Sequence, residues 1–364
     1  MQILSQGGSP VGNSALSLAI GDAAAVRRKL DTLTRQAGDG LISDAFSGLG
    51  SGAATALTLG PALANVATWQ RNINAVGGRM QTTQSALAQI SEIASSFFAQ
   101  TNNLNGLSAE AIDATAGSAR DALRQVAGLL NSKFGETYVF AGVYTSVPPV
   151  PNPDLILSSG MVTDITNTIG QLGVNGAAAT IATTLATASS NVAGTSPFAV
   201  QISQPAAVMQ NYRPVVQTGA NRYEPIGIVA GSNADVPSGG PSTTGSYIRD
   251  VMRALATIGA LTSGQSSVSG FGLVVQDTHA SLGDAVSALN GDAGVLGNRQ
   301  AALTETGRRL DDSVVALRSQ ISDAQDVDMA DTLSRLTATQ TQLQASYRLL
   351  STLRSLSLAS FLGG

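Results

Sequence analysis

Apolar residues alternate at intervals of three and four positions through residues 66–97, with Thr83 as the polar exception. They are Val66, Trp69, Ile73, Val76, Met80, Leu87, Ile90, Ala94 and Phe97. This pattern of a and d positions lasts for more than four heptads and predicts a helix over roughly residues 54–104 that packs along its length against another helix. At the usual rise per residue, this helix would be about 75 Å long.

Shorter helices are predicted on both sides of this long one. Residues 16–33 are periodic in apolar side chains, and a glycine-rich break follows between Gly38 and Gly52. Residues 102–108 have the composition of a turn. The segment 109–133 predicts a helix that folds back on the long one, through one face made of Ile112, Ala119, Leu123, Val126 and Leu130.

The C-terminal part predicts a helix over residues 247–261 and a longer helical region from about residue 269. Its apolar positions form two stripes, which are Leu303, Leu310, Val314, Leu317, Ile321 and Ala324, then Met329, Leu333, Leu336, Gln340, Leu343, Tyr347 and Leu350. The first spacing would continue onto Asp328 and Asp331, so we expect a kink near residues 326–328. The acidic cluster there is typical of a capping turn.

The middle of the chain differs in character from both ends. Prolines 148, 149, 151 and 153 open it, and prolines 237 and 241 close it. Short apolar runs between them, such as 198–202 and 226–229, favour strands and turns. We therefore predict a mainly α fold: a long antiparallel helical coiled-coil hairpin from the N- and C-terminal segments (1–142 and 246–364), with a small β-rich or mixed inserted domain (143–245).

The two apolar seams can be buried against each other, but a helix covered on one side still exposes apolar surface that needs a partner. Part of this core is therefore predicted to lie between subunits. The predicted assembly seam comprises Val66, Trp69, Ile73, Val76, Met80, Leu87, Ile90, Phe97, Leu310, Val314, Leu317, Ile321, Leu333, Leu336, Leu343, Tyr347 and Leu350.

Composition narrows the possible functions. Charged residues make up 12% of the chain and the net charge is -4, without a basic stripe, so nucleic acid is not an expected partner. The chain has no cysteine, which excludes disulfides and thiolate chemistry. No long uncharged apolar run predicts membrane insertion, and residues 1–10 lack the features of a cleaved signal peptide.

Candidate chemistry is sparse, and we predict no enzyme, no cofactor and no metal site. The lone histidine, His279, is interpreted as a surface residue on a helix. A calcium loop beginning at Asp326 would need glycine and glutamate where Asp331 and Thr337 stand. The glycines at 48, 50 and 52 do not have the spacing of a phosphate-binding loop. Carboxylates of the middle domain are few and scattered: Asp154, Asp164, Glu224 and Asp235.

Five sequence segments, taken in their order along the chain, resemble the segments of a known family. They are TLTRQAGDGLISDAFSGLG at 32–50, RNINAVGGRMQTTQSALAQI at 71–90, FGETYVFAG at 134–142, LGNRQ at 296–300 and DMADTLSRLTATQTQLQASYRLLSTLRSLSLASFL at 328–362. Together they resemble the family of bacterial flagellin and flagellar hook-associated protein 3, which forms the hook–filament junction. The resemblance covers the two terminal parts and leaves the middle hundred residues unmatched.

The resemblance implies an extracellular structural subunit of the bacterial flagellum that serves motility. It implies self-assembly through the terminal helices, contacts with other flagellar axial proteins, an export chaperone, and export without a cleaved signal peptide. Filament flagellin and the junction protein both remain open, although LSLASFL and YVFAG look closer to the junction protein. Two other classes also remain open: an extended helical secreted or phage-tail-like structural protein, and a hydrolase in the middle domain.

Overall fold

The computed structural model describes residues 11–106, 108–233 and 235–362, so the prediction about residues 1–10 lies outside the described residues. The chain forms two compact units. Unit 1 contains the chain up to Val66 and from Asp312 onward, and unit 2 contains Ala67–Asp311. The predicted three-part division into residues 1–142, 143–245 and 246–364 stays a prediction.

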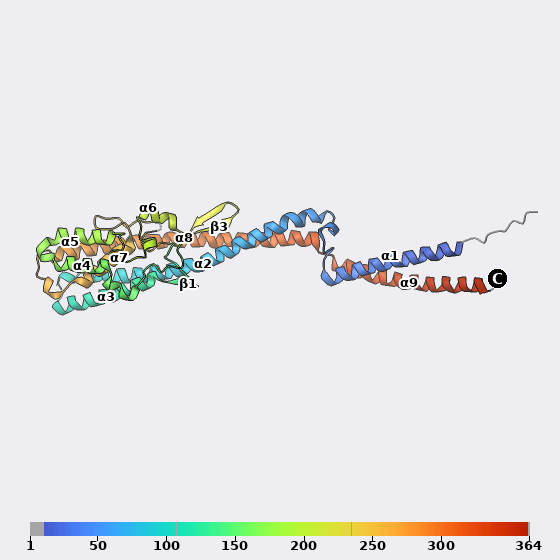
Figure 1. Cartoon of the computed structure of the whole chain (residues 1–364), viewed down its shortest axis with the longest axis horizontal. Coiled ribbons are helices and arrows are strands. Elements are labelled where there is room, and N and C mark those ends of the chain that lie inside the picture. Colours follow the sequence, from blue (N-terminus) through green and yellow to red (C-terminus); the bar gives the residue numbers. More distant parts are fainter. Residues whose placement is uncertain (1–10, 107, 234, 363–364) are drawn as a thin grey trace, which may run out of the picture. The chain divides into compact units, whose positions relative to one another are not determined.

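Helices dominate the described chain (Figure 1). The α-helices are α1 (Val11–Asp39), α2 (Gly52–Thr101), α3 (Ala109–Leu130), α4 (Gly160–Gly170), α5 (Leu172–Ser189), α6 (Ala206–Met209), α7 (Tyr247–Ala260), α8 (Phe271–Gln325) and α9 (Met329–Leu362). Two antiparallel hairpins join β1 (Lys133–Phe134) to β2 (Thr137–Tyr138) and β3 (Val215–Gly219) to β4 (Arg222–Pro225). The predicted mainly α class is confirmed.

In unit 2, α2 and α8 run antiparallel and are held together at intervals by polar bridges. Along α2, Gln81, Ser91 and Thr101 pair in turn with Gln300, Asn290 and His279 of α8. Residue numbers rise on one helix as they fall on the other, which is the pairing expected of a helical hairpin. The predicted coiled-coil hairpin is confirmed, and the heptad positions of α2 from Ile73 to Phe97 are buried.

Helix α3 folds back beside α2 and supplies one wall of the core. Its buried face includes Ile112, Leu123, Val126 and Leu130, as the spacing predicted. The hydroxyl of Ser108 accepts a hydrogen bond from the backbone of Ala111 and so caps the first turn. The amphipathic pattern and the cap together explain why the helix starts after the turn and which face it buries.

Helix α7 is the centre of unit 2. All of its residues from Tyr247 to Gly259 are buried, and it packs against α3, α4 and α5. A helix covered on every side would normally be apolar throughout. This one carries Arg249, Asp250 and Arg253, so its burial depends on polar partners supplied by distant segments.

The middle of the chain is mixed rather than β-rich. It contains α4, α5, α6 and the hairpin β3–β4, and the strands expected at 198–202 and 226–229 are wrong. Val200–Ile202 is a 3-10 turn. Ile226–Val229 is irregular because Pro225 precedes it and Gly227 adopts a φ of 76°, a conformation that breaks a ladder.

Unit 1 contains α1 packed against α9, together with the beginning of α2 and the end of α8. Gly52 begins α2 at a close approach to α8: a Cβ there would lie 2.6 Å from the carbonyl oxygen of Ala324. A glycine is therefore required where these two helices meet.

Candidate assembly surface

Helices α1 and α9 face each other through stripes with heptad spacing. The buried and half-buried positions are Ala19, Ala23, Val26, Leu30, Leu33 and Ala37 on α1, and Thr332, Leu336, Thr339, Leu343, Ser346 and Leu350 on α9. Half of the α9 stripe is threonine or serine, and half of the α1 stripe is alanine. Small side chains allow close approach but remove little apolar area from water, so this pair is weakly stabilised by its own contact.

Apolar side chains continue outside this stripe on the flanks of α9. Leu333 and Tyr347 are 49% and 50% exposed on one flank, and Leu349 and Leu353 are 64% and 36% exposed on the other. On α1, Leu18 is 71% exposed. Large apolar side chains that flank a seam on both sides are typical of a helix pair that packs into a larger assembly.

The α2 portion of the predicted seam is already covered within the chain. Its members from Ile73 to Phe97 belong to the core of unit 2, Trp69 is half-buried, and Val66 is buried in unit 1. Their packing partners lie in this same chain. A role between subunits therefore stays a prediction for these residues, and the structure gives them an internal role as well.

The C-terminal portion of the predicted seam divides between two surroundings. Val314 is buried and Leu310, Leu317 and Ile321 are half-buried along α8. On α9, Leu336, Leu343 and Leu350 lie in the stripe that faces α1. Leu333 and Tyr347 are the two members of the predicted seam that are exposed in the described chain, which makes them the strongest candidates for contact with another subunit.

The predicted break near residues 326–328 is confirmed, because α8 ends at Gln325 and α9 begins at Met329. One carboxylate oxygen of Asp328 accepts hydrogen bonds from the backbone of Ala330 and Asp331 at 2.9 and 3.1 Å, as expected of a cap. The backbone of Val327 donates to Gly40 at 2.9 Å. The break between α8 and α9 is thus joined to the break after α1.

The C-terminal part of the chain is similar to a known protein family. Residues 280–362 match the model of the bacterial flagellin C-terminal helical region. This match covers α8 from residue 280, the break and α9, so it includes the α9 part of the candidate assembly surface. The C-terminal helices of this chain are therefore similar to those of bacterial flagellin. The predicted role of structural subunit of the flagellum is confirmed at this level.

A solved structure shares the fold of this chain. It is a putative flagellar hook-associated protein from Vibrio parahaemolyticus, with 12% sequence identity and a TM-score of 0.50. The alignment covers 74% of this chain and 96% of that one. A search of curated protein sequences finds no match.

Membrane-spanning helices and metal-binding clusters were the other features considered for the described residues. Within the described residues, no helix is both long and apolar enough to cross a membrane. The same part of the chain contains no group of three or more His, Cys, Asp or Glu side chains placed to hold a metal ion.

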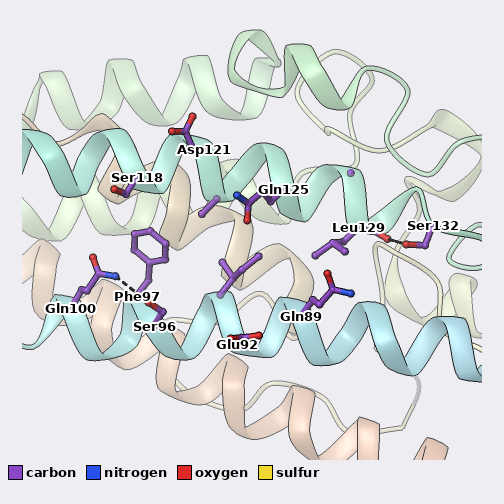
Figure 2. A pocket seen from close by; sticks show the side chains of 13 residues that line it. Gln89, Glu92, Ser96, Phe97, Gln100, Ser118, Asp121, Gln125, Leu129 and Ser132 are labelled. Atoms are coloured by element: carbon purple, nitrogen blue, oxygen red, sulfur yellow. Dashed lines mark hydrogen bonds between the residues drawn. The ribbon is translucent and has the colours of Figure 1, made fainter.

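A groove of about 900 Å³ runs between α2 and α3 on unit 2 (Figure 2). Phe97 and Leu129 are among its apolar lining residues, and Glu92, Asp121 and Gln125 are among its polar ones. The lining carries two carboxylates and no basic side chain. Polar side chains predominate in this groove because the apolar faces of the two helices are turned to the core.

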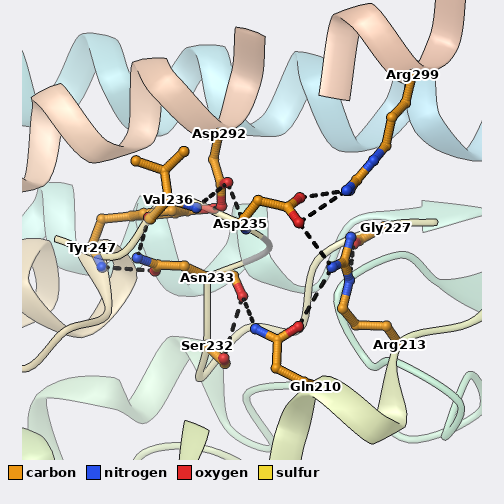
Figure 3. Close-up of polar contacts among 10 residues, drawn as sticks. All are labelled: Gln210, Arg213, Gly227, Ser232, Asn233, Asp235, Val236, Tyr247, Asp292 and Arg299. Atoms are coloured by element: carbon orange, nitrogen blue, oxygen red, sulfur yellow. Dashed lines mark hydrogen bonds and ion pairs between the residues drawn. The ribbon is translucent and has the colours of Figure 1, made fainter. Parts of the chain in front are cut away.

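A polar cluster fixes the segment before α7 to α8 (Figure 3). The fully buried carboxylate of Asp292 accepts hydrogen bonds from the backbone of Asp235 and Val236, both at 2.8 Å, and from the Tyr247 hydroxyl at 3.1 Å. Asn233 accepts from the backbone of Tyr247 at 3.0 Å. These bonds position the start of α7, and nothing in the sequence around Asp292 signals its role.

Charges around α7 are strongly affected by burial. Burial raises the pKa of Asp250, although Ser238 and Thr244 donate hydrogen bonds to it. Burial lowers the pKa of Arg249 to about 10. This guanidinium donates to the carbonyls of Gly231, Ala188 and Ser190. The charges of α7 therefore serve to join separate chain segments.

The interpretation of His279 as a surface residue is corrected by the structure. It lies on α8 as expected, but it is half-buried, and its ring stacks on Phe98 with centroids 4.2 Å apart. Its Nδ1 donates to the Phe98 carbonyl and lies 3.0 Å from the Thr101 hydroxyl. The contacts come from residues almost two hundred positions away, so they fasten α8 to the end of α2.

Proposed function

We propose that this chain enters the flagellar axial structure through the apolar flanks of α1 and α9, which pack against copies of itself and against neighbouring axial subunits. The observation that supports this most directly is the exposure of Leu333 and Tyr347 in the region that matches the flagellin C-terminal helices. About half of each side chain is already covered, so burying the remainder contributes roughly 1 kcal/mol each. Repeated in each copy, that contribution favours a polymer.

The finer parts of this role are also proposals. The chain acts as a building element without catalysis, reaches the outside of the cell without a cleaved signal peptide, and is escorted by an export chaperone. The scattered carboxylates of the middle domain support the first of these. Asp235 is engaged by Arg213 and Arg299, and Glu224 by Arg222, which leaves them poorly placed for acid–base work.

Within the family we favour the hook–filament junction over the filament. The LSLASFL ending and the YVFAG segment resemble the junction protein. The similar solved structure also carries the name of a hook-associated protein. A junction subunit would form short rings or remain monomeric without its neighbours, whereas a filament subunit would extend into long tubes on filament seeds.

The test is assembly of the double variant Leu333→Asp, Tyr347→Asp. Negative-stain microscopy and sedimentation would follow the purified protein with and without filament seeds or hook ends. We expect the variant to lose incorporation, because a carboxylate buried at a contact between subunits would lack a partner. The fluorescence of Trp69 would verify that unit 2 remains folded.

The matched control is Thr341→Asp, which places a carboxylate at an exposed α9 position on the face turned away from α1. It should assemble as the unmodified chain does. Normal incorporation of the double variant would contradict the proposal, and so would an equal loss in both variants.

A further inference from the structure

A small cavity lies between the hairpin β3–β4 and α8, within unit 2. Its volume is about 110 Å³. The hairpin side contributes Thr218, Arg222, Glu224, Pro225 and Ile226, and α8 contributes Arg299, Ala302, Leu303 and Thr306. Ile226 and Leu303 are buried, so the cavity has an apolar base beneath a set of polar groups. The space suits a group of a few heavy atoms rather than a sugar or a nucleotide.

Thr218 lines this cavity with an unsatisfied hydroxyl. The residue is 3% exposed, and its Oγ1 has no hydrogen-bond partner among the described residues. A buried hydroxyl without a hydrogen-bond partner destabilises the folded chain. Thr218 is also the bulged residue of the hairpin, where the register shifts between Gln217 and Gly219. Bulges re-aim a side chain, often beside a functional site.

Guanidinium groups give the cavity wall a positive character. Arg299 uses both terminal nitrogens on Asp235, at 2.6 and 2.9 Å, and Arg213 approaches the same carboxylate at 3.5 Å (Figure 3). Arg222 uses Nε on Glu224 at 3.0 Å. Within the described part of the chain, the Nε–H of Arg299 and the terminal nitrogens of Arg222 have no protein acceptor, and the Arg222 side chain is 61% exposed. The two arginines that line the cavity, together with the neighbouring Arg213, thus share two carboxylates.

We propose that this cavity binds a small carboxylate, either a free one or the side chain of an aspartate or glutamate on a second copy of the chain. The Thr218 hydroxyl and the N–H groups of Arg222 and Arg299 would donate to its two oxygens. Guanidinium groups match the planar geometry of a carboxylate, and the excess positive charge favours an anion. If the carboxylate comes from a second copy, the proposal rests on the proposed assembly function.

Glu224 allows a specific test of this site, because substitutions of Glu224 and of its partner Arg222 should change carboxylate binding in opposite directions. Its carboxylate lines the same cavity and repels an anion there, while it also holds Arg222 in place. Replacing Glu224 with glutamine keeps a side-chain oxygen for Arg222 and removes the repulsion. Binding of a carboxylate should therefore strengthen in Glu224→Gln and weaken in Arg222→Gln, although both positions belong to one ion pair.

The experiment is a titration of the full chain with sodium acetate at constant ionic strength, against sodium chloride, followed by the NMR signals of arginine Nε–H groups. We expect saturable shifts confined to the signals of Arg222 and Arg299. Thr218→Val and Arg222→Gln should each weaken acetate binding by about tenfold, the effect of one hydrogen bond to a charged group. Arg71→Gln, which removes an exposed arginine of the same unit, should leave it unchanged.

Absence of a saturable shift with acetate would overturn the proposal, as would equal weakening by Arg71→Gln. A second arm separates the two sources. If a neighbouring copy supplies the carboxylate, acetate should lower assembly of the unmodified chain but not of Arg222→Gln. If assembly ignores acetate while acetate still binds, the carboxylate is a free ligand. If the unmodified chain does not assemble at all, the proposed assembly function fails, but the acetate titration still decides whether the cavity binds a carboxylate.

Discussion

Helices α7 and α9 differ sharply in how they are covered. Every residue of α7 from Tyr247 to Gly259 is buried, including two arginines and an aspartate. Between Met329 and Ser355 of α9, only Thr332 and Thr339 are buried. Unit 2 therefore contains the partners that its central helix needs, whereas the terminal helix offers apolar flanks that the described chain leaves uncovered.

Side-chain volume, rather than periodicity, separates the two kinds of seam. Helices α2 and α9 both repeat at intervals of three and four residues. The α2 seam is filled by isoleucine, leucine, methionine and phenylalanine, while the α9 stripe facing α1 alternates leucine with threonine and serine. Large side chains complete a core within the chain, whereas small ones bury less apolar area, so the α1–α9 pair is stabilised less by its own contact.

The largest effect is expected from removing a buried charge at the centre of unit 2. Arg253 donates to Asp277 and to the carbonyl of Ser242, both at 3.0 Å, and the Arg253 side chain is 2% exposed. Arg253→Leu should lower the free energy of unfolding by about 3–5 kcal/mol, because Asp277 loses its ion-pair partner in a poorly solvated site and keeps only the hydrogen bond from Ser242. Urea unfolding followed by the fluorescence of Trp69, the single tryptophan, measures this.

The matched control removes an ion pair of α9. Arg335 and Asp331 lie 2.8 Å apart with side chains 65% and 50% exposed. Arg335→Leu should change the unfolding of α9, followed by circular dichroism, by less than about 1 kcal/mol. Similar losses for the two arginines would show that burial does not distinguish these regions.

The same substitution, leucine to alanine, can be compared between the core of unit 2 and the terminal helix α9. Leu123 of α3 is fully buried and Leu333 of α9 is 49% exposed. Leu123→Ala should cost about 2–5 kcal/mol of stability with no specific effect on assembly. Leu333→Ala should change the stability of the isolated chain by no more than about 0.5 kcal/mol, yet reduce incorporation into polymer. The reverse pattern would contradict the assignment of α9 as an assembly surface.

Sequence reasoning succeeded where one local pattern decided the structure. The heptads of α2 identified its buried face because each seam residue repeats the same relation to its neighbours. The acidic residues at the α8–α9 break identified a cap, since Asp328 acts on amides two and three residues away. Both predictions used residues within a few turns of each other.

It failed where partners come from distant parts of the chain. Arg249 and Arg253 look like surface residues of an amphipathic helix, but Ala188 and Asp277 satisfy them inside unit 2. The helices α4 and α5 were not predicted. Alanine, glycine and threonine give α5 a weak pattern. The buried face of α4, with Met161, Ile165 and Ile169, is a helical pattern, but it is short and lies in the proline-bounded part whose apolar runs favoured strands. Long-range packing also decides which apolar seam is buried within the chain. The heptad pattern alone does not contain that information.

Two adjacent glycines in α2 test the packing of unit 2 through smaller expected changes in stability. A Cβ at Gly78 would lie 2.5 Å from the Phe134 ring, whereas one at Gly77 would meet nothing within 4 Å. Gly78→Ala should destabilise unit 2 by about 1–3 kcal/mol through overpacking. Gly77→Ala should stabilise it by about 0.5–1 kcal/mol, because alanine favours the helix. Thermal unfolding of both variants is the measurement, and equal signs would refute the close packing of Phe134.

The smallest effect should come from the cap of α9. Asp328→Ala removes the acceptor for the amides of Ala330 and Asp331 and should cost about 1 kcal/mol. Asp328→Asn keeps a side-chain oxygen and should retain most of that contribution. Hydrogen exchange of the first turn of α9 measures the difference, with protection reduced in the alanine variant and unit 2 unchanged. If alanine and asparagine behaved alike, the start of α9 would be held by the backbone bond between Val327 and Gly40. In that case the two breaks of unit 1, rather than the cap, would define where the terminal helix begins.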